Sequence, residues 1–139
     1  MCNDLDDLMH GSILGTSQLL TSTEQWVEKS GIVRMISNLK KSGFRVFLTT
    51  DHGNIEAKGI KNLSLYEKVG TISRGKRHIR YSSEILAKSL RDSHPDLKFG
   101  QKDSSLYLTD KYAFTLENTT VIAHGGSHLW EVVVPFIQI

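Results

Sequence analysis

The chain has 139 residues, 39% of them hydrophobic, which suits one ordinary domain and excludes an assembly of several. Lysine and arginine exceed aspartate and glutamate by only 17 to 15, so the chain is neither strongly basic nor strongly acidic. Its one cysteine, Cys2, excludes an internal disulfide, and no apolar run approaches the ~20 residues of a membrane span. The acidic start lacks the apolar region of a signal peptide, so we expect a cytoplasmic protein.

The first third of the chain predicts a helix that leads into a strand. Residues 24–42 place apolar side chains at helical spacing, and Gly43 follows as a C-terminal stop. The apolar segment 44–49 is typical of a strand and is followed by the pair Asp51 and His52. Because open α/β folds bind substrates at the carboxyl ends of their strands, we expect this pair at a binding edge.

The next segment is unusually basic. Residues 55–80 are rich in Lys, Gly and Ser with weak periodicity, which predicts a long loop with short hairpin pieces around 68–72. Between residues 58 and 80 the only acidic residue is Glu67, and the seven basic residues are Lys58, Lys61, Lys68, Arg74, Lys76, Arg77 and Arg80. We define residues 55–81 as a basic excursion of the domain. The structural alternative is an ordinary solvated loop.

The remainder of the chain predicts one helix and several short strands. Residues 81–90 resemble a helix with Ser82 or Ser83 as its cap, and His94 before a proline marks the break after it. Strands are expected at 105–108, 113–115, 119–123 and 132–137. Pro135 places the last of them at a sheet edge or bulge. This order of elements favours an α/β architecture.

Side chains that bind metals occur in three places, at residues 3–12, 49–54 and 123–128. In the first, Asp6 and His10 are four residues apart and share a face if the segment is helical. Asp4 and Asp7 also lie near His10, so spacing alone leaves the pairing open. Carboxylates mixed with imidazoles suit zinc, with manganese as an alternative.

Four motifs stand out in the sequence: DLDDLMHGS near the start, TTDHGN at 49–54, RGKRHIRY at 74–81, and HGG followed by VVVPF near the end. Together they resemble the PglZ domain family of the alkaline phosphatase superfamily. The resemblance implies an alkaline-phosphatase-like sheet with flanking helices, and a metal-dependent phosphoester hydrolase, either phosphatase or phosphodiesterase. It implies that residues 1–139 are the C-terminal part of the domain, without the first strand and the nucleophile turn. The family is linked to phage resistance.

The resemblance also assigns site residues. One metal is implied at Asp6, His10 and His124, and a second at Asp51 and His52, so one or two divalent ions are expected, most simply zinc. The second site in the superfamily also uses an early Asp and a Ser or Thr nucleophile, which have no counterpart here. We therefore assign no catalytic nucleophile and expect weak or no activity from this chain alone.

The basic excursion offers the substrate contacts. We predict that phosphate oxygens are bound by Arg74, Lys76, Arg77 and Arg80, with arginine forming bidentate contacts. Tyr81 adds an aromatic face on which a base can stack. The expected substrate is a phosphoester, such as a nucleotide or nucleic acid. An exposed sheet edge also predicts self-association.

Each assignment has a simpler alternative. Asp51 and His52 suit an ordinary turn, and Asp6 suits a solvated acidic segment. His128 is interpreted as a surface group or a residue behind the ligands, while the lone histidines His78 and His94 are interpreted as surface residues. For the whole chain, the alternatives are a non-catalytic interaction module and a cationic nucleic-acid-binding fragment.

Overall fold

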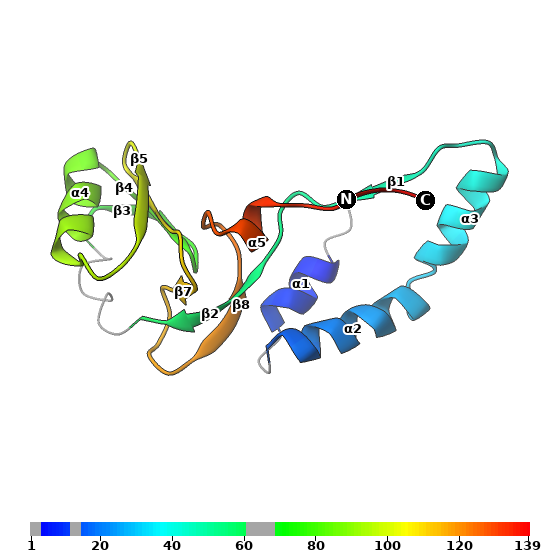
Figure 1. Cartoon of the computed structure of the whole chain (residues 1–139), viewed down its shortest axis with the longest axis horizontal. Helices are drawn as coiled ribbons and strands as arrows, with labels where there is room; N and C mark the ends of the chain where they lie inside the picture. Colours follow the sequence, from blue (N-terminus) through cyan, green and yellow to red (C-terminus); the bar gives the residue numbers. More distant parts are fainter. Residues whose placement is uncertain (1–3, 12–14, 61–68) are drawn as a thin grey trace.

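The structure is a computed structural model that describes residues 4–11, 15–60 and 69–139. It is an α/β fold, as predicted, and its elements form an elongated molecule (Figure 1). The helices are α1 (Asp4–Gly11), α2 (Thr16–Lys29), α3 (Ile32–Lys41), α4 (Glu84–Ser93) and α5 (Leu129–Val132). The strands are β1 (Phe47–Thr49), β2 (Ile55–Gly59), β3 (Thr71–Arg74), β4 (His78–Tyr81), β5 (Phe99–Lys102), β6 (Ser105–Leu108), β7 (Tyr112–Ala113), β8 (Thr120–Ala123) and β9 (Phe136–Gln138).

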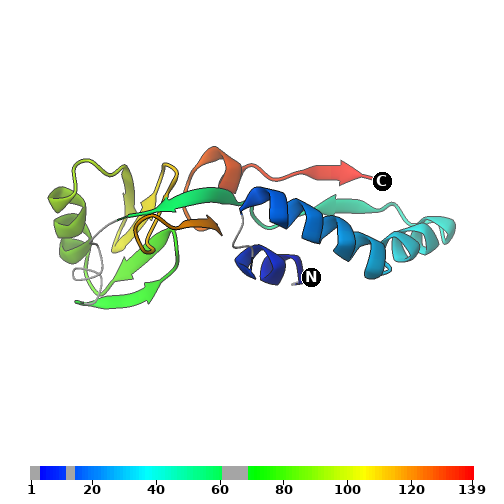
Figure 2. The same ribbon diagram turned by 90° about the horizontal axis from the view of Figure 1, so that it is seen from below.

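The described strands form three sheets in a row along the molecule. At one end, a four-stranded sheet of order β3-β4-β6-β5 packs against α4. In the middle, β2 pairs in parallel with β7 and antiparallel with β8. At the other end, β1 and β9 form a two-stranded antiparallel ribbon that extends alongside α2 and α3 (Figure 2). No helix in the described ranges is long and apolar enough to cross a membrane.

The helix expected at 24–42 is two helices. Gly31 separates α2 from α3 with φ of 74°, a left-handed conformation that a continuous right-handed helix cannot contain. At its start, α2 is fastened to the middle sheet, because the Thr16 amide and hydroxyl both donate to Glu56 of β2 at 3.0 Å. The spacing of apolar residues therefore predicted the helical state and missed the break.

The sequence predicted a long loop over 55–80 with short hairpin pieces around 68–72. Within the described residues, the strand at the start of this segment was missed, and a hairpin is present from Thr71. Strand β2 occupies Ile55–Gly59, where buried and exposed residues alternate, and β3 and β4 form an antiparallel hairpin with an irregular register at its outer end. Charged residues such as Glu56 and Lys58 occupy the exposed positions of β2. Their polar composition is the reason why the sequence pattern did not predict a strand here. The part of the predicted hairpin at residue 68 lies outside the described residues.

The later elements follow the predictions more closely. Ser83 caps α4 by accepting the Leu86 amide proton, and the helix ends at Ser93, just before His94. The strand expected at 105–108 is β6, and the strand at 119–123 begins one residue later as β8. Strand β7 is shorter than expected and joins the middle sheet, while β5 was not anticipated. Residues 132–137 divide between the end of α5 and the start of β9, with Pro135 before the strand.

The main hydrophobic core lies between α4 and the four-stranded sheet. Its buried residues are Ile79, Tyr81, Ala87, Leu90, Leu106, Leu108 and Phe114. A smaller cluster in the middle sheet is formed by Ile55, Ala57 and Ala113. By contrast, the apolar residues of β1 and β9 are exposed, although the Phe47 and Phe136 rings stack 5.3 Å apart.

Candidate metal centre

Helix α1 presents two of the predicted ligands on one face. Asp6 and His10 are one turn apart, with 3.5 Å between Asp6 Oδ2 and His10 Nε2. Met9 is buried and anchors the helix, which packs against α2 and β8. Trp26 Nε1 donates a hydrogen bond to Asp4 Oδ2 (3.1 Å), which connects α2 to the start of α1. Of the acidic residues in this segment, Asp6 is the one that faces the other histidines.

Asp51 and His52 follow β1, as the sequence predicted, and lie in its connection to β2. His52 is half-buried, with 33% of its side chain exposed, whereas Asp51 is 60% exposed. Asp51 Oδ1 lies 3.9 Å from His52 Nε2. The next residue, Gly53, donates its amide proton to the carbonyl of Glu131 at 2.9 Å, which fixes this connection against α5.

His124 follows β8 directly, and His52 lies three residues before β2, the strand that pairs with β8 in the middle sheet. The antiparallel register pairs Ile55 of β2 with Ala123 of β8, so the chain just before β2 and just after β8 meet. The His52 and His124 rings consequently stack, with centroids 3.8 Å apart and an interplanar angle of 13°.

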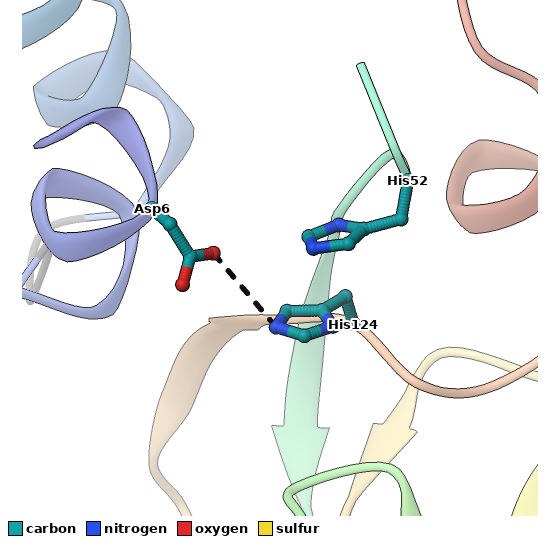
Figure 3. Close-up of side chains that lie close together, drawn as sticks. All are labelled: Asp6, His52 and His124. Atoms are coloured by element: carbon teal, nitrogen blue, oxygen red, sulfur yellow. Dashed lines mark ion pairs between the residues drawn. The ribbon is translucent and has the colours of Figure 1, made fainter. Parts of the chain in front are cut away.

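Three segments of the chain thus meet at one cluster (Figure 3). Asp6 Oδ1 lies 3.8 Å from His124 Nε2, and one ligand atom from each of Asp6, His52 and His124 lies within 4.8 Å of the others. The His10 ring approaches the His124 ring at 5.5 Å. The cluster therefore joins residues that the resemblance divides between two metals, with Asp6 and His124 from the first and His52 from the second.

The cluster lowers the pKa of His124 below its ordinary value. Desolvation by burial is the largest cause, and the positive charge that His52 carries when protonated is the next. Asp6 acts in the opposite direction. A lowered pKa keeps the imidazole neutral, and the neutral ring is the form that binds a metal. One carboxylate and two imidazoles are a donor set that fits zinc or manganese.

The position of the Arg77 side chain conflicts with the prediction that it contacts phosphate. Its side chain is fully buried, and its guanidinium donates to both carboxylate oxygens of Glu131, at 3.0 and 2.7 Å. It also donates to the carbonyls of Leu108 and Tyr112. A buried arginine with these partners is a structural group, and its guanidinium is not exposed to a phosphate at the surface.

The other basic residues of the predicted set remain nearer the surface. Arg74 donates to the Phe114 carbonyl at 2.7 Å, Lys76 is half-buried, and Arg80 is exposed on β4. His78 shares the face of β4 that carries Arg80, because residues two apart in a strand point the same way. A Cβ added at Gly125 would lie 2.8 Å from His78 Nδ1, so this ring packs beside the residue that follows His124.

His78 is half-buried, so the predicted surface position holds only in part. No spacing signal connects it with Gly125, because their contact depends on how two sheets meet. His128 behaves as expected for a residue outside the ligand set: its Nδ1 accepts the Trp130 amide proton at 3.3 Å and caps α5. His94 lies beyond the cluster, with its Nδ1 3.2 Å from the Leu90 carbonyl oxygen.

Comparison with known proteins identifies a family for this chain. No curated protein and no solved structure matches the chain significantly. The model of one family, described as the BREX system PglZ alkaline phosphatase-like domain, matches residues 2–139. That match covers nearly the whole chain and includes each of the metal-type residues considered above. The chain therefore belongs to the PglZ family of alkaline phosphatase-like domains.

Proposed function

We propose that this chain forms the metal-binding part of a metal-dependent phosphoester hydrolase. The observation that carries the proposal is the convergence of Asp6, His52 and His124, whose ligand atoms lie within 4.8 Å of one another although they come from distant segments. A phosphoesterase-type fold is what the family suggests. His10 and Asp51 lie at the margin of the cluster and complete the proposed ligand set.

Each residue has a defined task in this proposal. A bound divalent ion would act as a Lewis acid on a phosphoryl oxygen and lower the pKa of bound water. Asp6 supplies the negative charge of the site, and His52 and His124 supply neutral nitrogen ligands. Arg80 and Lys76, together with Arg74, provide positive charge for the phosphate oxygens. A nucleotide or nucleic acid is the substrate class that such a basic surface favours.

The 139 residues alone are expected to hydrolyse phosphoesters weakly or not at all. In the superfamily a Ser or Thr nucleophile forms the covalent intermediate, and the motifs of this sequence include no counterpart for it. Efficient metal-dependent turnover of a nitrophenyl phosphate ester that disappears in Asp51→Ala would contradict this expectation.

Metal content tests the proposal directly. Protein purified without chelator should contain zinc or manganese by elemental analysis, and Asp6→Ala, His52→Ala and His124→Ala should lose it. His94→Ala is the matched control, because it removes a histidine outside the cluster. Absence of metal from the wild-type chain, even after loading with zinc and manganese, would contradict the proposed site.

One observation favours a second function, a non-catalytic interaction module. The ribbon of β1 and β9 exposes apolar side chains, including Phe136 at 73% and Phe47 at 46%. Exposed apolar patches of this kind mark interaction surfaces. A metal-free chain that associates through this ribbon would support the module. Binding to nucleic acid that weakens with salt and survives chelation would instead support a nucleic-acid-binding role.

A further inference from the structure

We propose that the buried Arg77–Glu131 ion pair is the positioning device that holds the loops of His52 and His124 in their relative places. The inference builds on the proposed metal centre, but neither residue belongs to the predicted ligand set. The Arg77 side chain is 0% exposed and that of Glu131 is 2% exposed. A charge pair buried to this degree is costly to desolvate, so it calls for a specific explanation.

Glu131 is fully engaged by hydrogen bonds. Oε1 accepts Arg77 Nε at 3.0 Å and the Gly126 amide at 2.9 Å. Oε2 accepts Arg77 Nη2 at 2.7 Å and the His128 amide at 3.1 Å. The carboxylate thus binds the backbone of the connection between β8 and α5 at two points, while the arginine supplies its countercharge.

The same glutamate also reaches the other loop. Its backbone carbonyl accepts the Gly53 amide proton at 2.9 Å. Gly53 follows His52 directly, and Gly126 is two residues after His124. Glu131 therefore binds the chain beside both stacked histidines. Its backbone carbonyl binds the segment after His52, and its carboxylate binds the segment after His124.

Close packing at the two glycines supports this interpretation. A Cβ at Gly53 would collide with the backbone carbonyl of Trp130, and a Cβ at Gly126 would meet Arg77 Nη2 at 2.7 Å and Glu131 Oε2 at 2.8 Å. Backbone this close to Trp130 at Gly53, and to the ion pair at Gly126, leaves little room for the loops to shift. We expect the pair to limit the movement of both histidines.

Arg77 links this arrangement to the rest of the fold. Its Nη2 donates to the Leu108 carbonyl at 3.1 Å, and its own carbonyl accepts the Leu108 amide proton at 2.9 Å. Leu108 belongs to the main core. The arginine therefore fixes Glu131, and through it both loops, to the main core.

The first measurement uses the metal-free full chain, so it does not depend on the proposed function. Ring protons of His52 and His124 should show a nuclear Overhauser cross-peak, since the ring centroids are 3.8 Å apart. Glu131→Gln and Arg77→Met should lose this cross-peak. The double variant Arg77→Met/Glu131→Met is decisive, because it leaves no buried unpaired charge, as each single variant does, and it still removes the acceptor of the Gly126 and His128 amides.

A positioning role predicts that the double variant has a higher unfolding midpoint than either single variant but does not regain the cross-peak. Leu90→Ala is the matched control, because it destabilises the core at α4 without touching either loop. A cross-peak of wild-type intensity in Glu131→Gln and the double variant would overturn the inference. Its absence from the wild-type chain, or its equal loss in Leu90→Ala, would do the same.

The second measurement tests whether the Arg77–Glu131 ion pair affects metal binding. Titration with cobalt(II), followed by its visible absorption, should give a dissociation constant about 10- to 100-fold weaker in the double variant, as is typical when groups behind metal ligands are removed. Leu90→Ala should remain close to the wild type. If the wild-type chain binds no metal yet shows the cross-peak, the proposed function fails while the positioning role is judged by the first measurement alone.

Discussion

His124 is the residue through which pH should act on the stability of the metal-free chain. Its pKa is lowered in the folded state by burial and by His52, so the unfolded state takes up a proton at a higher pH than the folded state does. Asp6 and Glu131 oppose the shift, while His10 adds to it. The free energy of unfolding should therefore fall as the pH drops below about 6.5, and this contribution should level off below the folded-state pKa.

Urea unfolding between about pH 5 and 8 measures this dependence. His124→Gln keeps a neutral polar group, so its free energy of unfolding should fall less across the same range. Histidines elsewhere contribute equally to both proteins, and the difference between the two profiles isolates His124 and its coupling to the cluster. Parallel profiles would show that the burial of His124 does not penalise its charged form.

At Gly53 a single added carbon atom should affect both folding stability and metal binding. An added Cβ would collide with the backbone carbonyl of Trp130, which has no flexible end that can move aside. We expect Gly53→Ala to cost about 1–3 kcal/mol of folding stability, as overpacking does, and to weaken cobalt binding by displacing His52.

Gly43→Ala is the control for that substitution. Gly43 has φ of +85° and open space around it, so alanine there strains the backbone by about 1–2 kcal/mol without a collision. Its cobalt affinity should equal that of the wild type. Equal cobalt affinities for Gly53→Ala and Gly43→Ala would show that the close approach at Gly53 does not hold the site.

Among the elements, α2 depends on a remote carboxylate for its start. Glu56 of β2 accepts the Thr16 amide and hydroxyl protons, each at 3.0 Å, and places negative charge at the positive end of the helix. Gly15, the residue before the helix, provides no side chain for this purpose. Glu56→Ala should lower the free energy of unfolding by about 1 kcal/mol, the usual effect of losing a cap.

Lys58→Ala is the matched control, since Lys58 occupies the next exposed position of the same strand. Urea unfolding of both variants compares a lost cap with a simple truncation on the surface. A Glu56→Ala protein as stable as Lys58→Ala would mean that water replaces the carboxylate at no cost.

Short-range sequence patterns predicted the elements and residues that depend only on nearby positions in the chain. The four-residue spacing of Asp6 and His10 is one such pattern, and the pair Asp51 and His52 at the end of an apolar strand is another; both indicate metal ligands. The strand β2 was missed because its buried positions hold small residues, Ala57 and Gly59, between charged ones. Small side chains give weak hydrophobic periodicity even where they are buried.

Arg77 shows why part of the site escaped sequence reasoning. A run of basic residues usually indicates a solvated surface, and here one member of the run is fully buried. Its partner, Glu131, is 54 residues away in a four-residue helix. Pairing over that distance is a property of the tertiary fold, and the charge pattern of neither segment specifies it.

At the scale of the whole molecule, the ribbon of β1 and β9 stands apart from the hydrophobic cores. Every residue of both strands is exposed, and the Phe47 and Phe136 rings stack against each other. An isolated pair of strands is marginally stable in water, and its outer edge has unpaired backbone groups. We therefore expect a second copy of the chain to cover this ribbon at high protein concentration.

Sedimentation velocity over a range of concentrations tests this expectation. The apparent mass should rise with concentration, and the double variant Phe47→Ser/Phe136→Ser should require at least about tenfold more protein for the same rise, because burial of each phenylalanine contributes about 1.5–3 kcal/mol. Ile85→Ser is the control, since Ile85 is 79% exposed on α4 at the opposite end of the molecule. An equal effect of Ile85→Ser would indicate general surface hydrophobicity, and a mass independent of concentration would show that the ribbon does not bind another copy.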